Sequence, residues 1–167
     1  MKLTPGLDPA CEMGPVISRE QFESICEYLK VGSAEGAKVV CGGRPADREG
    51  WFIQPTLLTV TDNSLRVVQE EIFGPVLVAM PFDDDDEALR LANDNSYGLG
   101  ASVWTQDISR AMRFVSHLEA GTVWVNSHDL VDNAIPFGGF KDSGFGKDLG
   151  PEQLEHFLRT KAVWVSS

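Results

Sequence analysis

Residues 69–76, QEEIFGPV, place two adjacent carboxylates directly before an aromatic side chain and a Gly-Pro pair. A carboxylate can accept two hydrogen bonds from a vicinal diol, so Glu71 could bind the hydroxyls of a ribose. Phe73, two residues further on, could pack against a flat ring beside that ribose. On the residues alone a solvated turn between two apolar runs is the simpler interpretation, so the stretch stays open between a turn and a ligand clamp.

A second stretch that could contribute to a binding site is the loop at residues 126–137, which follows the apolar run TVWV. Leu130, Val131, Ile135 and Phe137 form an apolar patch on this loop, and such side chains either line a substrate pocket or pack the loop down. The Gly-rich continuation of the loop is long and rich in aromatics, which favours an ordered, functional loop over a linker. It contains neither G-x-G-x-x-G after a strand nor a Walker motif, so we do not expect a phosphate cradle.

The cysteines and histidines do not suggest catalysis. Three widely spaced cysteines without a C-x-x-C pair fit reduced thiols in a cytoplasmic protein. Cys26 falls on the apolar face of an expected helix and is interpreted as a small buried hydrophobe. Cys11 and Cys41 have no nearby histidine or basic residue that would activate a thiol. The histidines have no metal-ligand spacing, and we expect no catalytic residue in this chain.

The acidic run DDDDE at residues 83–87 stands just before an apolar helical pattern. Negative charge is favourable at a helix N-terminus, where an aspartate can also cap the first amides. A helix cap therefore explains the run. A calcium site is the alternative interpretation, and we expect no metal.

The elements that would position these residues alternate between strands and helices, which is typical of an α/β fold with a parallel-type sheet and flanking helices. A helix is expected after Ser18, which has capping-box spacing to Gln21, and another after Asp107. A short helix is expected from Pro151. Strands are expected in AKVVC, ASVWT, TVWVN, the terminal KAVWVSS and the apolar runs at 56–60, 65–68 and 76–80, the last covered on both faces. Ligands of such sheets bind beyond the carboxyl ends of the strands, where both candidate stretches lie.

Composition places the chain among ordinary globular proteins. Its 167 residues suffice for one domain with a core, 43% of them are hydrophobic and 23% charged, and no internal domain boundary is evident. The net charge of -11 argues against binding to nucleic acid or to an anionic membrane. We find no signal-peptide pattern and no apolar run near the roughly 20 residues of a membrane span.

Taken in order, the motifs resemble the C-terminal part of the NAD(P)-dependent aldehyde dehydrogenase superfamily along the whole chain. The resemblance is carried by LDPACEMGPVIS, EGAKVVCGG, FIQPTLL, EEIFGPV, LANDNSYGLGASVWTQD, AGTVWVNSHD, PFGGFKDSGFGKDLG and TKAVWV. The loop NSHDLVDNAIPFGG looks most like the phenylacetaldehyde dehydrogenase branch. The family implies oxidation of an aldehyde to a carboxylic acid, in which a thiolate attacks the aldehyde, hydride passes to nicotinamide and a glutamate-activated water releases the acid.

The resemblance assigns roles to individual residues. Glu71 matches the glutamate that binds the nicotinamide ribose, and Phe73 matches the aromatic that positions the nicotinamide. Phe137 matches an aromatic wall of the substrate tunnel, with Leu130 and Val131 in the neighbouring tunnel-lining loop.

The resemblance also implies a division of the chain and a set of missing parts. Residues 1–159 would be part of the catalytic domain, and residues 160–167 would hold the oligomerisation strand, Ala162–Val165, which pairs with a partner subunit. The family's nucleophilic cysteine, general-base glutamate and dinucleotide-binding domain would precede this chain. We therefore expect a fragment that is inactive alone and binds no cofactor, from a homo-oligomeric enzyme that uses NAD or NADP. A non-catalytic self-association or assembly module is the alternative.

Overall fold

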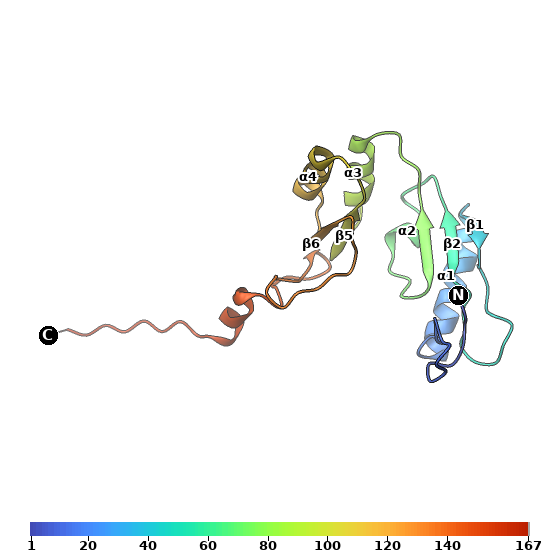
Figure 1. Cartoon of the computed structure of the whole chain (residues 1–167), viewed down its shortest axis with the longest axis horizontal. Coiled ribbons are helices and arrows are strands. Elements are labelled where there is room, and N and C mark those ends of the chain that lie inside the picture. Colours follow the sequence, from blue (N-terminus) through green and yellow to red (C-terminus); the bar gives the residue numbers. More distant parts are fainter. Residues whose placement is uncertain (167) are drawn as a thin grey trace. The chain divides into compact units, whose positions relative to one another are not determined.

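The structure, a computed structural model, describes residues 1–166 and divides into two compact units, the first spanning Met1–Asp83 and the second beginning at Asp84 (Figure 1). This division had no counterpart in the composition of the chain, where no boundary was expected. Each unit is a mixture of helices and short strands, so the α/β class is confirmed. Instead of one parallel sheet, the described chain holds a three-stranded sheet and two sheets of two strands.

The long helix of the first unit is α1, Arg19–Ala34. It begins at Ser18, whose Oγ accepts a hydrogen bond from the Gln21 amide at 3.2 Å, as the spacing predicted. Ile25 and Leu29 on its inner face are buried, and Cys26 packs against the same core. The predicted helix and its apolar face are therefore confirmed.

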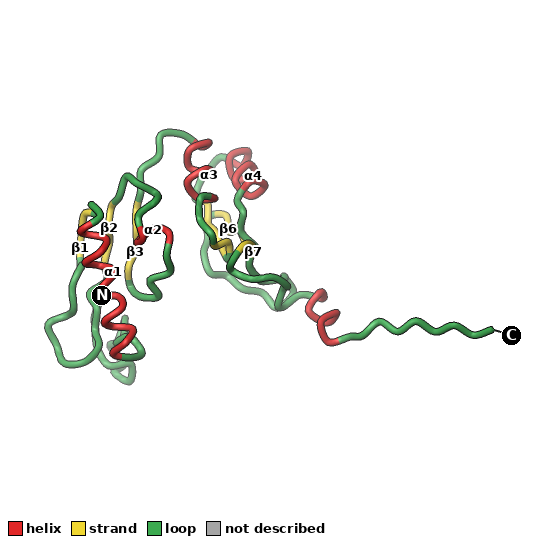
Figure 2. The backbone as a smooth tube through the Cα atoms, turned by 180° about the vertical axis from the view of Figure 1, so that it is seen from behind, coloured by secondary structure: helices red, strands yellow, loops and turns green. Residues whose placement is uncertain are grey.

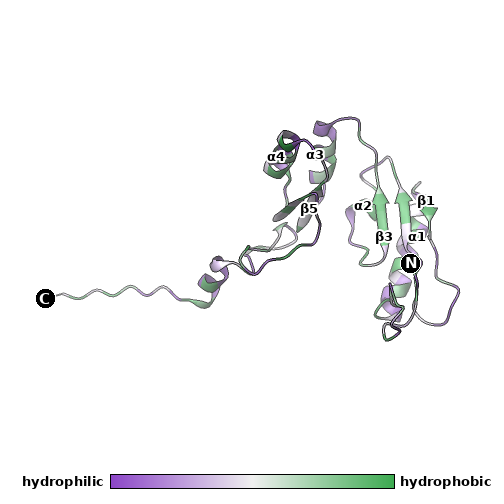
Figure 3. Cartoon of the chain, viewed as in Figure 1, coloured by the Kyte–Doolittle hydropathy of each residue, from purple (hydrophilic) through white to green (hydrophobic). Residues whose placement is uncertain are grey.

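The sheet of the first unit consists of β1 (Lys38–Cys41), β2 (Thr56–Thr59) and β3 (Val76–Ala79), in that order. β2 and β3 run parallel, and β1 pairs antiparallel with β2. Figure 3 shows β3 and β1 as hydrophobic segments. Val76 and Val78 pack against the core, but Leu77 is exposed. The prediction that this run is covered on both faces is wrong for this chain, because the core cluster covers only the face that carries Val76 and Val78.

The apolar run at residues 65–68 was expected to be a strand, and this prediction is wrong. The structure places a short helix there, α2, Arg66–Gln69. Val67 is buried against Gly32 of α1, where an added Cβ would lie only 2.5 Å from Val67 Cγ1. Short apolar runs suit a strand or a buried helix equally well, so this packing decided the outcome.

Within its described residues, the second unit contains two sheets and three helical segments. Figure 2 shows its strands in yellow and its helices in red. β5 (Gly100–Val103) and β6 (Thr122–Val125) pair in parallel, and β4 (Tyr97–Gly98) pairs antiparallel with β7 (Phe140–Lys141). The helical segments are α3, Asp85–Asn93, α4, Ile108–His117, and the 3-10 helix η1, Pro151–Phe157. The N-caps Asp84 and Asp107 each accept backbone hydrogen bonds, so the predicted helix starts are confirmed.

The end of the described chain differs from expectation. Residues 158–166 form neither helix nor strand, and Val163, Trp164 and Val165 are exposed. A strand in Ala162–Val165 was expected and is not formed within residues 1–166, because a β-strand depends on hydrogen bonds to a neighbouring strand and none pairs with this segment. Ser167 lies outside the described residues.

Within residues 1–166, no helix combines the length and the apolar character that a membrane span requires.

Candidate functional site

The QEEIFGPV stretch forms a loop that joins α2 to β3 and is fastened to α1. The side-chain amide of Gln21 donates hydrogen bonds to two successive carbonyls, those of Ile72 at 3.0 Å and Phe73 at 2.8 Å. The Ile72 side chain is buried in the core, whereas the Phe73 ring is 74% exposed. The loop is therefore an anchored segment that presents an aromatic ring to solvent.

The backbone of this loop is unusual at two positions. Phe73 has a φ of +52°, in the left-handed region that a bulky L-residue rarely adopts. Such conformations cost about 1–3 kcal/mol and cluster at ligand-binding sites. At Gly74 an ideal Cβ would lie 2.4 Å from Ile25 Cδ1, so only glycine lets the loop approach α1 this closely. The backbone of Phe73 favours a ligand-contacting loop, and the close approach of Gly74 shows that the loop packs on α1.

The first carboxylate of the pair, Glu70, is occupied by neighbours. Arg66 donates to it from Nε at 2.8 Å and from Nη2 at 2.9 Å, and the Tyr28 hydroxyl donates to Oε2 at 2.8 Å. These hydrogen bonds favour the charged carboxylate, and those from Arg66 and then Tyr28 lower the pKa of Glu70 to about 2. The same interaction with Glu70 raises the pKa of Tyr28.

The second carboxylate, Glu71, is exposed, and the described part of the chain provides it with no hydrogen bond or ion pair. Of two adjacent glutamates, only this one is available to a ligand. Glu71 and Phe73 were predicted as site residues from the sequence, whereas Gln21, Tyr28 and Arg66 were not. The four-residue spacing from Arg66 to Glu70 was a signal for their ion pair, whereas the other two contacts had none.

The predicted substrate-lining residues belong to the second unit. Leu130 and Val131 are exposed on the loop after β6. The loop is fastened to β5 and β6, because Trp124 Nε1 donates to the Leu130 carbonyl at 2.8 Å and Ser102 Oγ lies 2.6 Å from His128 Nδ1. The apolar side chains are therefore presented outward rather than packed down.

The environment of Phe137 differs from that of Leu130 and Val131. Its backbone exchanges hydrogen bonds with Asp148 at 2.7 and 2.8 Å, and Phe137 lines a cavity of about 430 Å³. Ser143, Gln153 and His156 also line this cavity, whereas Leu130 and Val131 do not. Of the three predicted substrate residues, this cavity therefore holds Phe137 alone.

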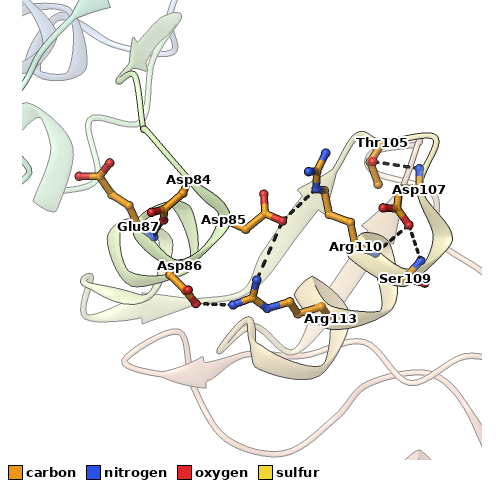
Figure 4. Close-up of polar contacts among 9 residues, drawn as sticks. All are labelled: Asp84, Asp85, Asp86, Glu87, Thr105, Asp107, Ser109, Arg110 and Arg113. Carbon is orange, nitrogen blue, oxygen red and sulfur yellow. Dashed lines mark hydrogen bonds and ion pairs between the residues drawn. The ribbon is translucent and has the colours of Figure 1, made fainter.

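The acidic run caps one helix and pairs with another (Figure 4). Asp84 Oδ1 accepts from the Glu87 amide at 2.8 Å. Asp85 pairs with Arg110 Nε at 2.9 Å, and Asp86 pairs with Arg113. In residues 1–166 no group of three or more histidine, cysteine or acidic side chains is placed to hold a metal ion.

All three cysteines are free thiols. Cys26 packs partly buried against the core of the first unit, and this burial raises its pKa. Cys11 Sγ donates to the Thr4 carbonyl at 3.1 Å, and Cys41 is exposed at the end of β1. The predicted packing role of Cys26 is confirmed.

Comparisons with known proteins converge on one group of enzymes. Residues 1–163 match the sequence model of the aldehyde dehydrogenase family. A phenylacetaldehyde dehydrogenase from Pseudomonas fluorescens is 44% identical over 163 residues, which are 96% of this chain and 32% of the relative.

Two solved structures are similar as well. A betaine aldehyde dehydrogenase from Staphylococcus aureus in complex with NAD+ is 45% identical with a TM-score of 0.91, over 96% of this chain and 32% of that one. An NAD+ complex of an aldehyde dehydrogenase from Bacillus cereus is 44% identical with a TM-score of 0.95, over 98% and 33%. This chain thus spans about a third of the length of these relatives.

Proposed function

Because this chain belongs to the aldehyde dehydrogenase family, we propose that it corresponds to the C-terminal third of a family member and serves the NAD(P)-linked oxidation of an aldehyde to a carboxylic acid. The order of EEIFGPV and PFGGFKDSGFGKDLG along the chain supports this assignment. The observation that carries the proposal is the pair of Glu71 and Phe73, both exposed on a loop that is anchored at its backbone.

The two side chains suit a nicotinamide riboside. Glu71 is an unpaired carboxylate that can accept two hydrogen bonds from the ribose hydroxyls. Phe73 offers an exposed aromatic face and edge for the adjoining flat ring. The cofactor, when bound in the complete enzyme, supplies the hydride acceptor. This chain's own contribution is to bind and orient the riboside.

We further propose that the substrate is an apolar aldehyde of the phenylacetaldehyde type. The 44% identity to a phenylacetaldehyde dehydrogenase supports this, as do the exposed Leu130 and Val131 on a fastened loop. Phe137 serves as an aromatic wall in the same proposal.

This chain alone does not turn over aldehyde in our proposal, since none of its thiols has the surroundings of a nucleophile. Burial raises the pKa of Cys26 and disfavours its thiolate. The assay follows NADH absorbance with phenylacetaldehyde and short aliphatic aldehydes. Turnover by the homogeneous chain would refute this part of the proposal.

The riboside grip can be tested directly on the chain. Without the rest of the cofactor site the chain should retain no complete cofactor, but Glu71 and Phe73 should still bind a riboside weakly. Nicotinamide mononucleotide is therefore titrated to about millimolar concentration, since a Kd of about 1 mM corresponds to a binding free energy of about -4 kcal/mol. We expect amide chemical-shift changes at Glu71 and Phe73 that Glu71→Gln removes and Glu49→Gln, at another exposed glutamate, retains. Equal changes in both variants would contradict the assignment of Glu71.

A second candidate function is that of an assembly module. The exposed Val163, Trp164 and Val165 lie in a segment with no strand partner in the described chain, and unpaired apolar segments promote association. We propose that Ala162–Val165 forms a strand with a partner subunit in a homo-oligomer. Light scattering of the chain at micromolar concentration tests this, with a variant that lacks residues 162–167 as control. A clean monomer before truncation argues against the module.

A further inference from the structure

We infer that Gln21, Tyr28 and Arg66 are positioning residues of the loop that carries Glu71 and Phe73. Tyr28 and Arg66 immobilise Glu70 and thereby leave Glu71 as the carboxylate that meets the ligand, while Gln21 sets the direction of Phe73. This inference rests on the proposed function and extends it to residues that do not themselves touch the cofactor.

Arg66 holds Glu70, the residue at which the loop begins. Its guanidinium donates to both oxygens of Glu70, and its backbone carbonyl accepts the Glu70 amide at 2.9 Å. Backbone and side chain of Glu70 are thus both held by one residue of α2. The Arg66 amide donates in turn to Glu35 Oε2 at 3.1 Å, next to the end of α1. The direction in which the chain continues to Glu71 is therefore determined before the ligand arrives.

The rest of the loop is held by a stripe along α1. Gln21, Ile25 and Tyr28 have the spacing i, i+4 and i+7, which places them on one face of the helix. Each contacts a different part of the loop. Tyr28 donates to the Glu70 carboxylate, Ile25 lies against Gly74, and Gln21 donates to the carbonyls of residues 72 and 73.

This arrangement has more to do with geometry than with stability. The side chains of Arg66 and Glu70 are 50% and 41% exposed, and exposed ion pairs contribute little to folding. A two-pronged contact of arginine with a carboxylate nevertheless fixes orientation, which a lysine cannot do. If both adjacent glutamates were free, they would compete for the same ligand hydroxyls. Tyr28 and Arg66 remove that competition because they hold Glu70.

The decisive variants change one contact each. Tyr28→Phe removes only the hydroxyl, and Arg66→Lys keeps the charge but loses the fork. Gln21→Glu keeps the size of the side chain and places a favourable carboxylate in the first turn of α1, so it removes the amide donor without weakening the helix. Tyr97→Phe and Arg44→Lys are matched controls at exposed positions elsewhere.

Three measurements on the full chain compare the variants with the unmodified protein. The carboxyl resonance of Glu70 is titrated, 15N relaxation gives backbone order at residues 71–74, and nicotinamide mononucleotide is added to about millimolar concentration. We expect Tyr28→Phe and Arg66→Lys to raise the pKa of Glu70 from about 2 toward its ordinary 4.5. We expect all three variants to lower the order of the loop and to reduce the ligand-induced shift at Phe73 several-fold, and the controls to change neither.

The outcomes separate the inference from the proposed function. If the ligand shifts no resonance of the unmodified chain, the proposed cofactor function is overturned. If Glu70 titrates in its ordinary range, or if the variants leave loop order and ligand shifts at the level of the controls, the positioning role is overturned.

Discussion

One methyl group added at Gly74 should push the QEEIFGPV loop away from helix α1. An ideal Cβ at this position would lie 2.4 Å from Ile25 Cδ1 and 2.8 Å from Ile25 Cγ1. Carbon atoms in contact prefer about 3.5–4.0 Å, so one group must move by about 1 Å. Ile25 is 0% exposed and has no solvent space to turn into. We therefore expect Gly74→Ala to displace the loop that carries Glu71 and Phe73.

The magnitude follows from two opposing effects. Overpacking of a well-packed core costs about 1–3 kcal/mol. Replacing glycine by alanine returns about 0.4–1 kcal/mol where alanine can adopt the backbone conformation, because the unfolded chain becomes less free. Gly74 does not lie in the left-handed region, so this gain applies. The first unit should lose about 1–2 kcal/mol of its free energy of unfolding as the difference.

The assay is urea unfolding of the chain, followed at the amide resonances of Leu29 and Leu58, which both lie in the core of the first unit. Ile25→Val removes the nearest atom and should cost about 0.5–1.5 kcal/mol alone. Combined with Gly74→Ala it removes the closer of the two contacts, that with Cδ1, so the double variant should be more stable than the sum of the single changes predicts by about 1 kcal/mol.

Gly14→Ala is the control, since an added Cβ there meets no atom within 4 Å. It should be neutral or slightly stabilising. Single changes at Ile25 and Gly74 that simply add, within about 0.5 kcal/mol, would refute the packing argument.

Three further predictions concern charged groups. Replacing Arg110 and Arg113 by glutamine should lower the free energy of unfolding of the second unit by no more than about 3 kcal/mol in total, because their three ion pairs with Asp85 and Asp86 contribute about 0–1 kcal/mol each. Urea unfolding at low salt and at about 1 M salt tests this, and an equal loss at both contradicts an ion-pair origin. Asp107→Ala removes the acceptor for two amides at the start of α4 and should cost about 1 kcal/mol, whereas Asp107→Asn should retain most of the stability in the same assay. The folded pKa of Glu70 is about 2 and its ordinary value 4.5, so its contribution to the first unit is complete above about pH 4.5 and is lost as the pH falls toward 2. Unfolding curves of the unmodified chain and of Glu70→Gln should therefore converge between these pH values, and a constant difference would show that the ionised carboxylate is not responsible.

Signals carried by neighbouring residues predicted much of the secondary structure. Ser18, the acidic run at residues 83–87 and Asp107 marked the starts of three helices, because a capping side chain needs only the amides two or three residues away. The apolar face of α1 was predicted by the helical period for the same reason. The run at 65–68 and the strand at Ala162–Val165 could not be settled in this way. The first depends on the packing of Val67 against Gly32, and the second on a strand partner that residues 1–166 do not supply.

The candidate site, too, was predicted in part from the sequence and decided in part by packing. Residue types and motif order were enough to select Glu71 and Phe73 and to suggest a family, since a carboxylate two residues before an aromatic in a specific stretch is visible in the chain itself. Which of the two adjacent glutamates is free was decided by packing. The hydroxyl that occupies Glu70 comes from Tyr28, 42 residues earlier, and the amide that holds Phe73 comes from Gln21, 52 residues earlier. Contacts between residues so far apart in sequence form only when α1 lies beside the loop, so no local sequence pattern could have predicted them.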